Sequence, residues 1–243
     1  MKLNSTFKAW FGALLFLAGI LLGLALSASV TWGQMEAGLY TSNNGDARLN
    51  LKCPLMLATN ETGVIKANIV NRMEEDVTPL VSAEISHAPV PRKLDQIVAL
   101  KSRDSQMVEW TVDSSDVIFG RLILVDILQS HYRNNPAFSG SCGILLFSLF
   151  GMTGMETFSL TFALSLIAML SGRALWSNTR QPLDSFSKNL MRINTVLMGI
   201  IILALLSTFP RWWGLTIFLD ALTLLVMGII FTDFILVPQK HQG

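Results

Sequence analysis

Charged residues are scarce in this chain of 243 residues, because Asp, Glu, Lys and Arg make up 14% of it while 51% is hydrophobic. The mean hydropathy is positive, at +0.49. A soluble domain normally carries about 25% charged residues. The scarcity of charge therefore argues against a single soluble domain and favours a membrane protein.

The sequence also lacks the residue patterns of common active sites. It has no phosphate-binding glycine loop, no dinucleotide fingerprint, no H-E-x-x-H, no G-x-S-x-G and no C-x-x-C-H for haem. Ser86 and His87 are neighbours, but adjacent residues of a strand point to opposite faces, so they do not suit a nucleophile and its base. We therefore expect a protein that is not an enzyme and that has no cofactor.

Four long apolar stretches stand in place of the missing charge, at residues 9–31, 153–176, 193–209 and 215–237. Each is predicted to cross a hydrocarbon core about 30 Å thick as a helix rising about 1.5 Å per residue, although the third is barely long enough. The first could instead be a signal peptide, since the small residues Ala25, Ser27 and Ala28 would allow cleavage. Its length favours a retained anchor.

The second span has a start that can be recognised in the sequence. Thr153 and Glu156 have the spacing of a capping box, in which the hydroxyl and the carboxylate satisfy backbone donors at a helix end. The preceding apolar segment, Cys142 to Met152, is too short to cross a membrane. We expect it to form a final strand or an interfacial segment.

Basic residues in the short loops predict the orientation. The loop at 177–192 contains Arg180, Lys188 and Arg192, whereas the turn at 210–214 has only Arg211. The N-terminus at 1–8 and the tail at 238–243 also contain lysine. Because cytoplasmic loops are rich in Lys and Arg, both termini and the loop are expected in the cytoplasm of a plasma membrane protein, with the turn and residues 33–152 outside.

The external block at 33–152 has the pattern of a β-sandwich and its stalk, with β-type runs separated by turn residues throughout. The expected fold is an α+β membrane protein: four transmembrane helices with one extracytoplasmic immunoglobulin-like β-sandwich inserted between helices 1 and 2. In the run Met107 to Val112, alternation places Trp110 on the apolar face, which favours a core residue over a binding platform. The candidate strands are Arg48–Leu57, Gly63–Asn71, Leu80–His87, Leu94–Lys101, Gln106–Val112 and Gly120–Gln129.

Four segments of the external block share a recognisable pattern, namely Asn60-Glu-Thr-Gly63, Ile65-Lys-Ala-Asn-Ile-Val-Asn71, Val81-Ser-Ala-Glu-Ile-Ser-His87 and Glu109-Trp-Thr-Val112. They resemble the bacterial immunoglobulin-like modules that are attached to membrane and cell-surface proteins. In those modules an early strand ends in an Asn and a later strand carries Trp-x-Val. The whole layout, with Cys53-Pro54 early and Ser141-Cys-Gly-Ile144 before the second span, is similar to uncharacterised membrane proteins of chloroflexus-type filamentous bacteria. The resemblance covers roughly residues 45 to 175. It implies a fold and no activity.

The only two cysteines, Cys53 and Cys142, both fall in the external block, where an oxidising compartment favours a disulfide. The bond would close a loop of about ninety residues and contribute about 4 kcal/mol in the chain-entropy model. Two buried free thiols and a lipid-modified cysteine are the alternatives. His87 and His131 do not have the spacing of metal ligands, so we expect no metal site.

Ionisable residues at membrane depth are the strongest functional lead. Asp220 lies about five residues inside the fourth span. Burying a carboxylate among lipid tails is costly, so Asp220 is expected to face another helix, to stay protonated, or to pair with Arg211, near the level of Glu156. Asp233 lies near the inner end and is expected to reach the interface. Structural pairing is favoured over an ion path, since the first and third spans have no acidic residue or His.

The first span also contains a packing motif, Gly19-x-x-x-Gly23, which permits another helix to approach closely. Two functional classes follow from the whole sequence. In the first, the protein is a non-catalytic integral membrane accessory or assembly subunit, whose sandwich docks on a partner and whose helices pack in a larger membrane complex. In the second, it is a small transporter or channel component with acidic residues in the helix bundle. A third class, a receptor, ranks last. Whichever class holds, the partners of the protein are expected to be other membrane subunits and the lipid bilayer, not nucleic acid.

Overall fold

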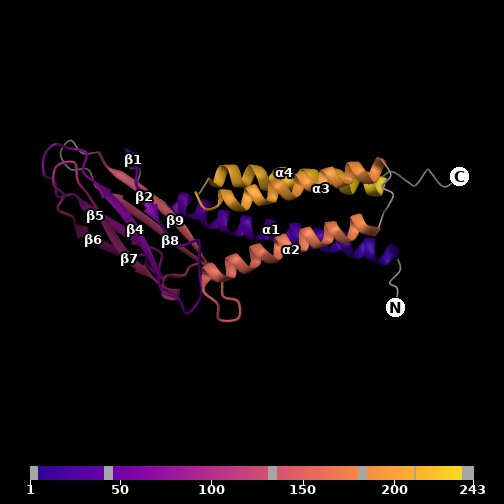
Figure 1. The fold of residues 1–243 in the computed structure, drawn as a ribbon. Helices are drawn as coiled ribbons and strands as arrows, with labels where there is room; N and C mark the ends of the chain where they lie inside the picture. Colours follow the sequence, from indigo (N-terminus) through magenta and orange to yellow (C-terminus); the bar gives the residue numbers. More distant parts are fainter. Residues whose placement is uncertain (1–4, 41–45, 131–135, 180–184, 211, 237–243) are drawn as a thin grey trace. The chain divides into compact units, whose positions relative to one another are not determined.

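The structure, a computed structural model, describes residues 5–40, 46–130, 136–179, 185–210 and 212–236, with only the backbone at 5–6, 179, 185–190 and 231–236. Within them the chain forms one helix, then nine strands, then three further helices (Figure 1). It divides into two compact units: the helix unit, Met1–Thr31 with Ser159–Gly243, and the β unit, Trp32–Phe158. The α+β class predicted from the sequence is confirmed.

The helices are α1 (Ser5–Tyr40), α2 (Gly154–Thr179), α3 (Ser185–Ser207) and α4 (Trp213–Leu236). Three segments are long and apolar enough to cross a membrane, namely Phe7–Tyr40, Gly154–Asn178 and Trp213–Ile230. These three segments indicate a membrane protein. The apolar part of α3, Met191–Ser207, is shorter than they are, so the predicted span at 193–209 is not equally supported. The helix ends before residue 209 because Pro210 disfavours helical backbone at the residue preceding it.

Helix α1 extends nine residues beyond the end predicted at residue 31. The continuation contains Gln34, Met35, Glu36 and Ala37, which are good helix formers, and no proline interrupts it. The end of an apolar run shows where the composition stops being typical of a membrane span, but the helix can continue beyond it. The prediction that the external block is β throughout is therefore wrong for its first residues.

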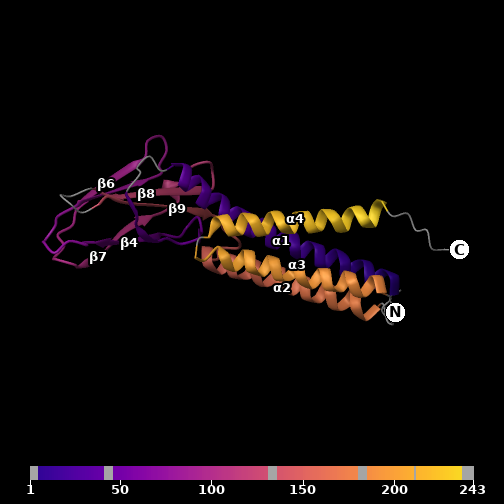
Figure 2. The same cartoon turned by 90° about the horizontal axis from the view of Figure 1, so that it is seen from above.

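The β unit contains two facing sheets, with β6, β8 and β9 in one layer and β4 and β7 in the other (Figure 2). The larger sheet has the order β1-β9-β8-β5-β6, with β3 also paired to β9, and the smaller has the order β2-β4-β7. Strands β1 and β3 run parallel to β9, and the other strand pairs of the described residues are antiparallel. The strands are β1 (Ala47–Arg48), β2 (Asn50–Lys52), β3 (Met56–Leu57), β4 (Gly63–Val70), β5 (Leu80–Ile85), β6 (Arg92–Ile97), β7 (Ser105–Val112), β8 (Leu122–Gln129) and β9 (Phe138–Leu146).

Four of the predicted strands, now β4, β5, β7 and β8, are confirmed with ends within two residues of those expected. The strand expected at Leu94–Lys101 is displaced to β6, and the final strand begins at Phe138 instead of Cys142. The strand expected at Arg48–Leu57 is divided into β1, β2 and β3, which alternate between the sheets. Pro54 accounts for the last break, because proline has no N–H to donate to a ladder.

The core of the β unit lies between the two sheets and receives side chains from both. The smaller sheet supplies Val108, Trp110 and Val112 from alternate positions of β7. Trp110 is thus a core residue, as predicted. Inward-facing residues of the larger sheet are Val81, Ala83, Ile85, Ile123, Val125, Ile127 and Ile144.

The last turns of α1 lie on the opposite face of the larger sheet. Gln34 Nε2 donates to Gly143 O at 2.7 Å, and Tyr40 Oη donates to Glu84 Oε1 at 3.4 Å. A Cβ added to Gly143 would lie 1.8 Å from Gly33 O, so helix and strand touch through their backbones. This contact explains why β8 is buried on both faces instead of alternating.

Candidate functional site

Asp220 on α4 is the centre of the candidate site in the helix unit. The Ser27 hydroxyl of α1 lies 2.8 Å from Asp220 Oδ1 and 3.1 Å from Oδ2, and it donates to the carboxylate. Ser27 is buried and Asp220 is half-buried. Asp220 therefore faces another helix, which was one of the three arrangements expected. Arg211, the other expected partner, lies outside the described residues.

The same face of α4 holds two buried threonines. Thr216 Oγ1 lies 2.7 Å from Ser207 Oγ of α3, and Thr223 Oγ1 donates to Leu219 O of its own helix at 2.9 Å. Both threonines are fully buried. The polar side chains of this face thus form hydrogen bonds between helices or to helix backbone. This pattern is typical of polar residues that hold membrane helices together.

Gly19 and Gly23 lie where α1 meets its neighbours. A Cβ on Gly19 would lie 2.8 Å from Met169 N of α2, and one on Gly23 would lie 2.8 Å from Ile201 Cγ2 of α3. Ser165 Oγ donates to Gly19 O at 2.8 Å, which ties α2 to the same site on α1. The absence of side chains at both positions allows this approach.

Sequence reasoning missed a second glycine contact between α1 and α2. A Cβ on Gly12 would lie 2.8 Å from Gly172 O, and one on Gly172 would lie 2.6 Å from Gly12 O. Gly12 stands seven residues before Gly19, so it shares a helical face with it. That spacing was the available signal.

Glu156 and Asp233 are the other acidic residues that the sequence singled out. Glu156 belongs to the capping box at the start of α2: Thr153 N donates to Glu156 Oε2 at 2.9 Å, and Glu156 N donates to Thr153 Oγ1 at 3.3 Å. This confirms the capping box expected from the sequence. Asp233 lies in α4, but its side chain is outside the described residues.

The β unit holds a buried acidic residue that the sequence did not single out. Asp116 Oδ2 lies 3.0 Å from Arg92 Nη2, and Asp116 Oδ1 lies 3.6 Å from His87 Nδ1. Ser86 Oγ donates to Asp116 O at 2.6 Å and accepts from Leu124 N at 2.9 Å. The Ser86 hydroxyl is therefore used in holding two loops together, which is a structural task. The only sequence signal for Asp116 was the presence of an Asp in a polar loop.

Asp113 begins the same loop and caps its short 3-10 helix, Ser114–Asp116. Hydrogen bonds from the side chain and the backbone of Ser115 hold the pKa of the Asp113 carboxyl below its ordinary 3.8. In the described parts of the chain, no three His, Cys, Asp or Glu side chains are grouped in a way that could hold a metal ion.

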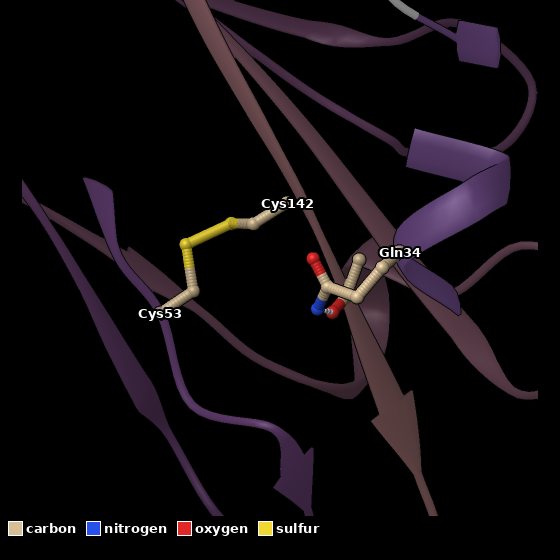
Figure 3. The surroundings of a disulfide bond; sticks show 4 residues. Gln34, Cys53 and Cys142 are labelled. Atoms are coloured by element: carbon tan, nitrogen blue, oxygen red, sulfur yellow. Dashed lines mark hydrogen bonds between the residues drawn. A yellow bond between two sulfur atoms is a disulfide. The ribbon is translucent and has the colours of Figure 1, made fainter. Parts of the chain in front are cut away.

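Cys53 and Cys142 form the predicted disulfide (Figure 3). Their Cα atoms lie 6.6 Å apart, and 89 positions separate them in the sequence. Cys142 is fully buried in the core, and the next residue, Gly143, faces α1 and accepts the hydrogen bond from Gln34. The bond thus joins the segment between β2 and β3 to β9, on the core side of the strand that α1 covers.

Comparison with known proteins gives a fold likeness at most. No protein-family model and no curated protein matches the chain. Similar solved structures include a cycloisomaltooligosaccharide glucanotransferase from Paenibacillus sp., at 19% identity and a TM-score of 0.36, covering 44% of this chain and 15% of that one. A β-glucosidase from Listeria innocua has 13% identity and a TM-score of 0.32, covering 45% of this chain and 17% of that one.

A third similar structure is a CARDB domain from Pyrococcus furiosus, at 11% identity and a TM-score of 0.33, covering 44% of this chain and 99% of that one. It is an immunoglobulin-like domain. The chain spans less than a fifth of the length of the two enzymes, and likenesses this weak carry no argument about catalysis. None of them shows the expected similarity to membrane proteins of chloroflexus-type bacteria.

Proposed function

We propose that this protein is a non-catalytic integral membrane accessory or assembly subunit. Its β unit docks on a partner outside the cytoplasm, and its helices pack in a larger membrane complex. The observation that carries this proposal is the use of the polar groups in the helix unit. Asp220, Ser165 and Thr216 are each hydrogen-bonded to a neighbouring helix, as expected of residues that specify packing.

The outward side of the helices supports the same proposal. Of the apolar side chains of α4 that the structure describes, most are exposed within this chain, among them Phe218, Leu224, Leu225 and Ile229. Such a surface suits lipid or the helices of another subunit. A helix so sparsely packed within its own chain gains most from neighbours outside it.

The β unit is proposed to be an immunoglobulin-like module. The order β9-β8-β5-β6 in one sheet and β2-β4-β7 in the other corresponds to the G-F-C-C′ and A-B-E orders of that fold. The divided first strand pairs with both sheets, through β2 on one side and through β1 and β3 on the other. Modules of this kind bind other proteins in many settings, which suits docking on a partner.

Four spans and an external β unit complete the proposed topology. Helix α3 has 23 residues, which at about 1.5 Å per residue gives about 34 Å, enough for a hydrocarbon core of about 30 Å. Four crossings would put both termini and the connection between α2 and α3 on one side, and the excess of basic residues there favours the cytoplasm for that side. The disulfide supports an oxidising compartment for the β unit.

The experiment that tests the proposal is extraction of the tagged chain from native membranes in mild detergent, followed by native mass measurement and proteomics. Larger membrane subunits are expected to co-purify in fixed stoichiometry. They should be absent from a mock purification of cells that lack the tagged chain. Recovery only as a monomer or as a homo-oligomer would refute the proposal.

A small transporter or channel component is the second candidate. It is favoured by one observation, the carboxylate of Asp220 half-buried among helices. Flux assays in proteoliposomes with the wild type and Asp220→Asn separate the two candidates. Ion flux that the substitution abolishes while the protein stays assembled would establish transport, and no flux in the wild type would exclude it for the isolated chain.

A further inference from the structure

Four loops of the β unit meet at the end where α2 begins, and we call this the α2 end. They are the loops at 58–62, 86–91, 113–121 and 147–153. The strand register brings their flanks together, since Leu122 pairs with Leu145, Ile85 with Arg92, and Gly63 with Val112. Leu146 N donates to Arg121 O at 2.7 Å, which joins the end of the third loop to the last residue of β9, directly before the fourth loop.

Two of these loops present a phenylalanine to solvent in the same unusual way. Phe119 is 77% exposed and Phe150 is 92% exposed. Both have positive φ, 51° and 50°, and each is followed by a glycine with φ of 73° or 74°. A bulky side chain in the left-handed region is uncommon and strained. The two Phe-Gly turns therefore hold their rings outward, in a backbone conformation that phenylalanine disfavours.

Val90, in the loop at 86–91, adds a third apolar tip and is 67% exposed. Ser86, at the start of that loop, is bonded to Asp116 and Leu124, which lie on either side of the Phe119 turn in the sequence. Exposed apolar residues of this size on three neighbouring loops are more than scattered surface residues.

The chain leaves the α2 end of the β unit as helix α2. Helix α2 is a candidate span from Gly154, three positions after the Phe150-Gly151 turn. Gly154 is fixed to the sandwich, because its N–H donates to Glu61 Oε2 at 2.8 Å and a Cβ there would lie 2.2 Å from Met56 O. On α1, exposed Trp32 precedes Gly33, which packs near Leu122 at the same end.

We propose that the α2 end of the β unit is a lipid-binding surface that lies in the headgroup layer of the bilayer, with Phe119 and Phe150 as its anchors. The occupant is the bilayer that α2 enters, because the loop bearing Phe150 runs directly into that span. Trp and Tyr are enriched at this depth, and Phe is among the apolar side chains that segments lying in the interface bury there. Exposed Arg121, beside the Phe119 turn, suits lipid phosphate. This inference does not depend on the proposed subunit role.

Depth measurement on the full chain in phosphatidylcholine nanodiscs tests the proposal. The native cysteines form a disulfide, so Phe119→Cys and Phe150→Cys each provide one thiol for a nitroxide label. Collision rates with oxygen, which concentrates in lipid, and with a water-soluble nickel complex report the depth of the label. The matched control is Ile97→Cys, since Ile97 is apolar and 71% exposed but pairs with Leu80 at the other end of β6.

Labels at 119 and 150 are expected to collide more with oxygen than with nickel and to lie about 5–10 Å into the interface, whereas the label at 97 should behave as in water. Val90→Cys provides a third site, and this substitution leaves both Phe-Gly turns intact. If 90, 119 and 150 were as accessible to nickel as 97, the lipid surface would be refuted, and a protein partner would be the better occupant. Purified protein in defined lipid contains no such partner, so protection there can come only from the bilayer.

Discussion

Replacement of Gly143 by alanine is predicted to detach the end of α1 from strand β9 of the larger sheet. The new Cβ would lie 1.8 Å from Gly33 O, 2.3 Å from Gly33 C and 3.0 Å from Gly33 Cα. All three are backbone atoms, so no side chain can rotate away. Ordinary contact begins at about 3.4 Å, so the helix must move from the strand by more than an ångström.

The movement has a calculable effect on stability. It would break the buried hydrogen bond from Gln34 to Gly143 O, for which an orphaned group costs about 1–3 kcal/mol. Overpacking of a filled contact adds about 1–3 kcal/mol. We expect the free energy of unfolding to fall by about 2–6 kcal/mol, which at about 2–4 °C per kcal/mol for a chain of this size lowers Tm by about 4–24 °C.

Thermal unfolding of the purified protein in mild detergent measures this change. The matched control is Gly38→Ala on the same part of α1, where an added Cβ meets nothing within 4 Å. Because alanine favours helix over glycine by about 1 kcal/mol, the control should be neutral or slightly stabilising. Equal Tm values for Gly143→Ala and the wild type would refute the backbone contact between α1 and β9.

Three further predictions concern the disulfide, the helix contact and a loop. Reduction of Cys53–Cys142 should lower the free energy of unfolding by about 4 kcal/mol, because it frees a loop of 89 positions; identical melting with and without reductant would contradict this. Ser27→Ala removes the donor to Asp220 and should cost about 1 kcal/mol in detergent unfolding titrations, and no loss would show the bond to be idle. Asp113→Ala should be less stable than the wild type at neutral pH. Because folding lowers the pKa of Asp113 below 3.8, its contribution is complete above that value and fades as the pH falls through the folded pKa. The difference in Tm between the wild type and Asp113→Ala should therefore be larger at pH 7 than at pH 3. An equal difference at both pH values would contradict the capping role.

The sequence predicts elements well where one pattern decides the structure. Alternation located β7 and the burial of Trp110, and the spacing of Thr153 and Glu156 located the start of α2. Apolar length located the spans whose composition is unbroken. In each case the deciding forces act between residues near in sequence, so reading the chain in order is sufficient.

Features that depend on tertiary contact escaped sequence reasoning. Strand β6 is an edge strand with little burial, so its register follows from its hairpin partner β5 and not from its own pattern. The first strand is divided because its parts pair with the edges of two different sheets, β1 and β3 with β9 and β2 with β4. Among polar residues, facing another helix was one of the three arrangements expected for Asp220, but the sequence did not single out Ser27 as the residue it meets. A serine in an apolar span has no signature that distinguishes a donor to another helix from a local bond to its own backbone.

Residues Trp32–Tyr40 therefore belong to the β unit in energetic terms, although their sequence continues a membrane span. They cover the outer face of the larger sheet, where Leu122 and Leu124 are buried in addition to the core residues of β8. A fragment beginning at residue 46 would expose that apolar face, whereas one beginning at residue 32 would keep it covered. With both fragments ending at residue 152, we expect the shorter one to aggregate and to bind a hydrophobic dye, and the longer one to elute as a monomer in size-exclusion chromatography. If the two were equally soluble, the end of α1 would be dispensable and the large effect predicted for Gly143→Ala would lose its physical basis.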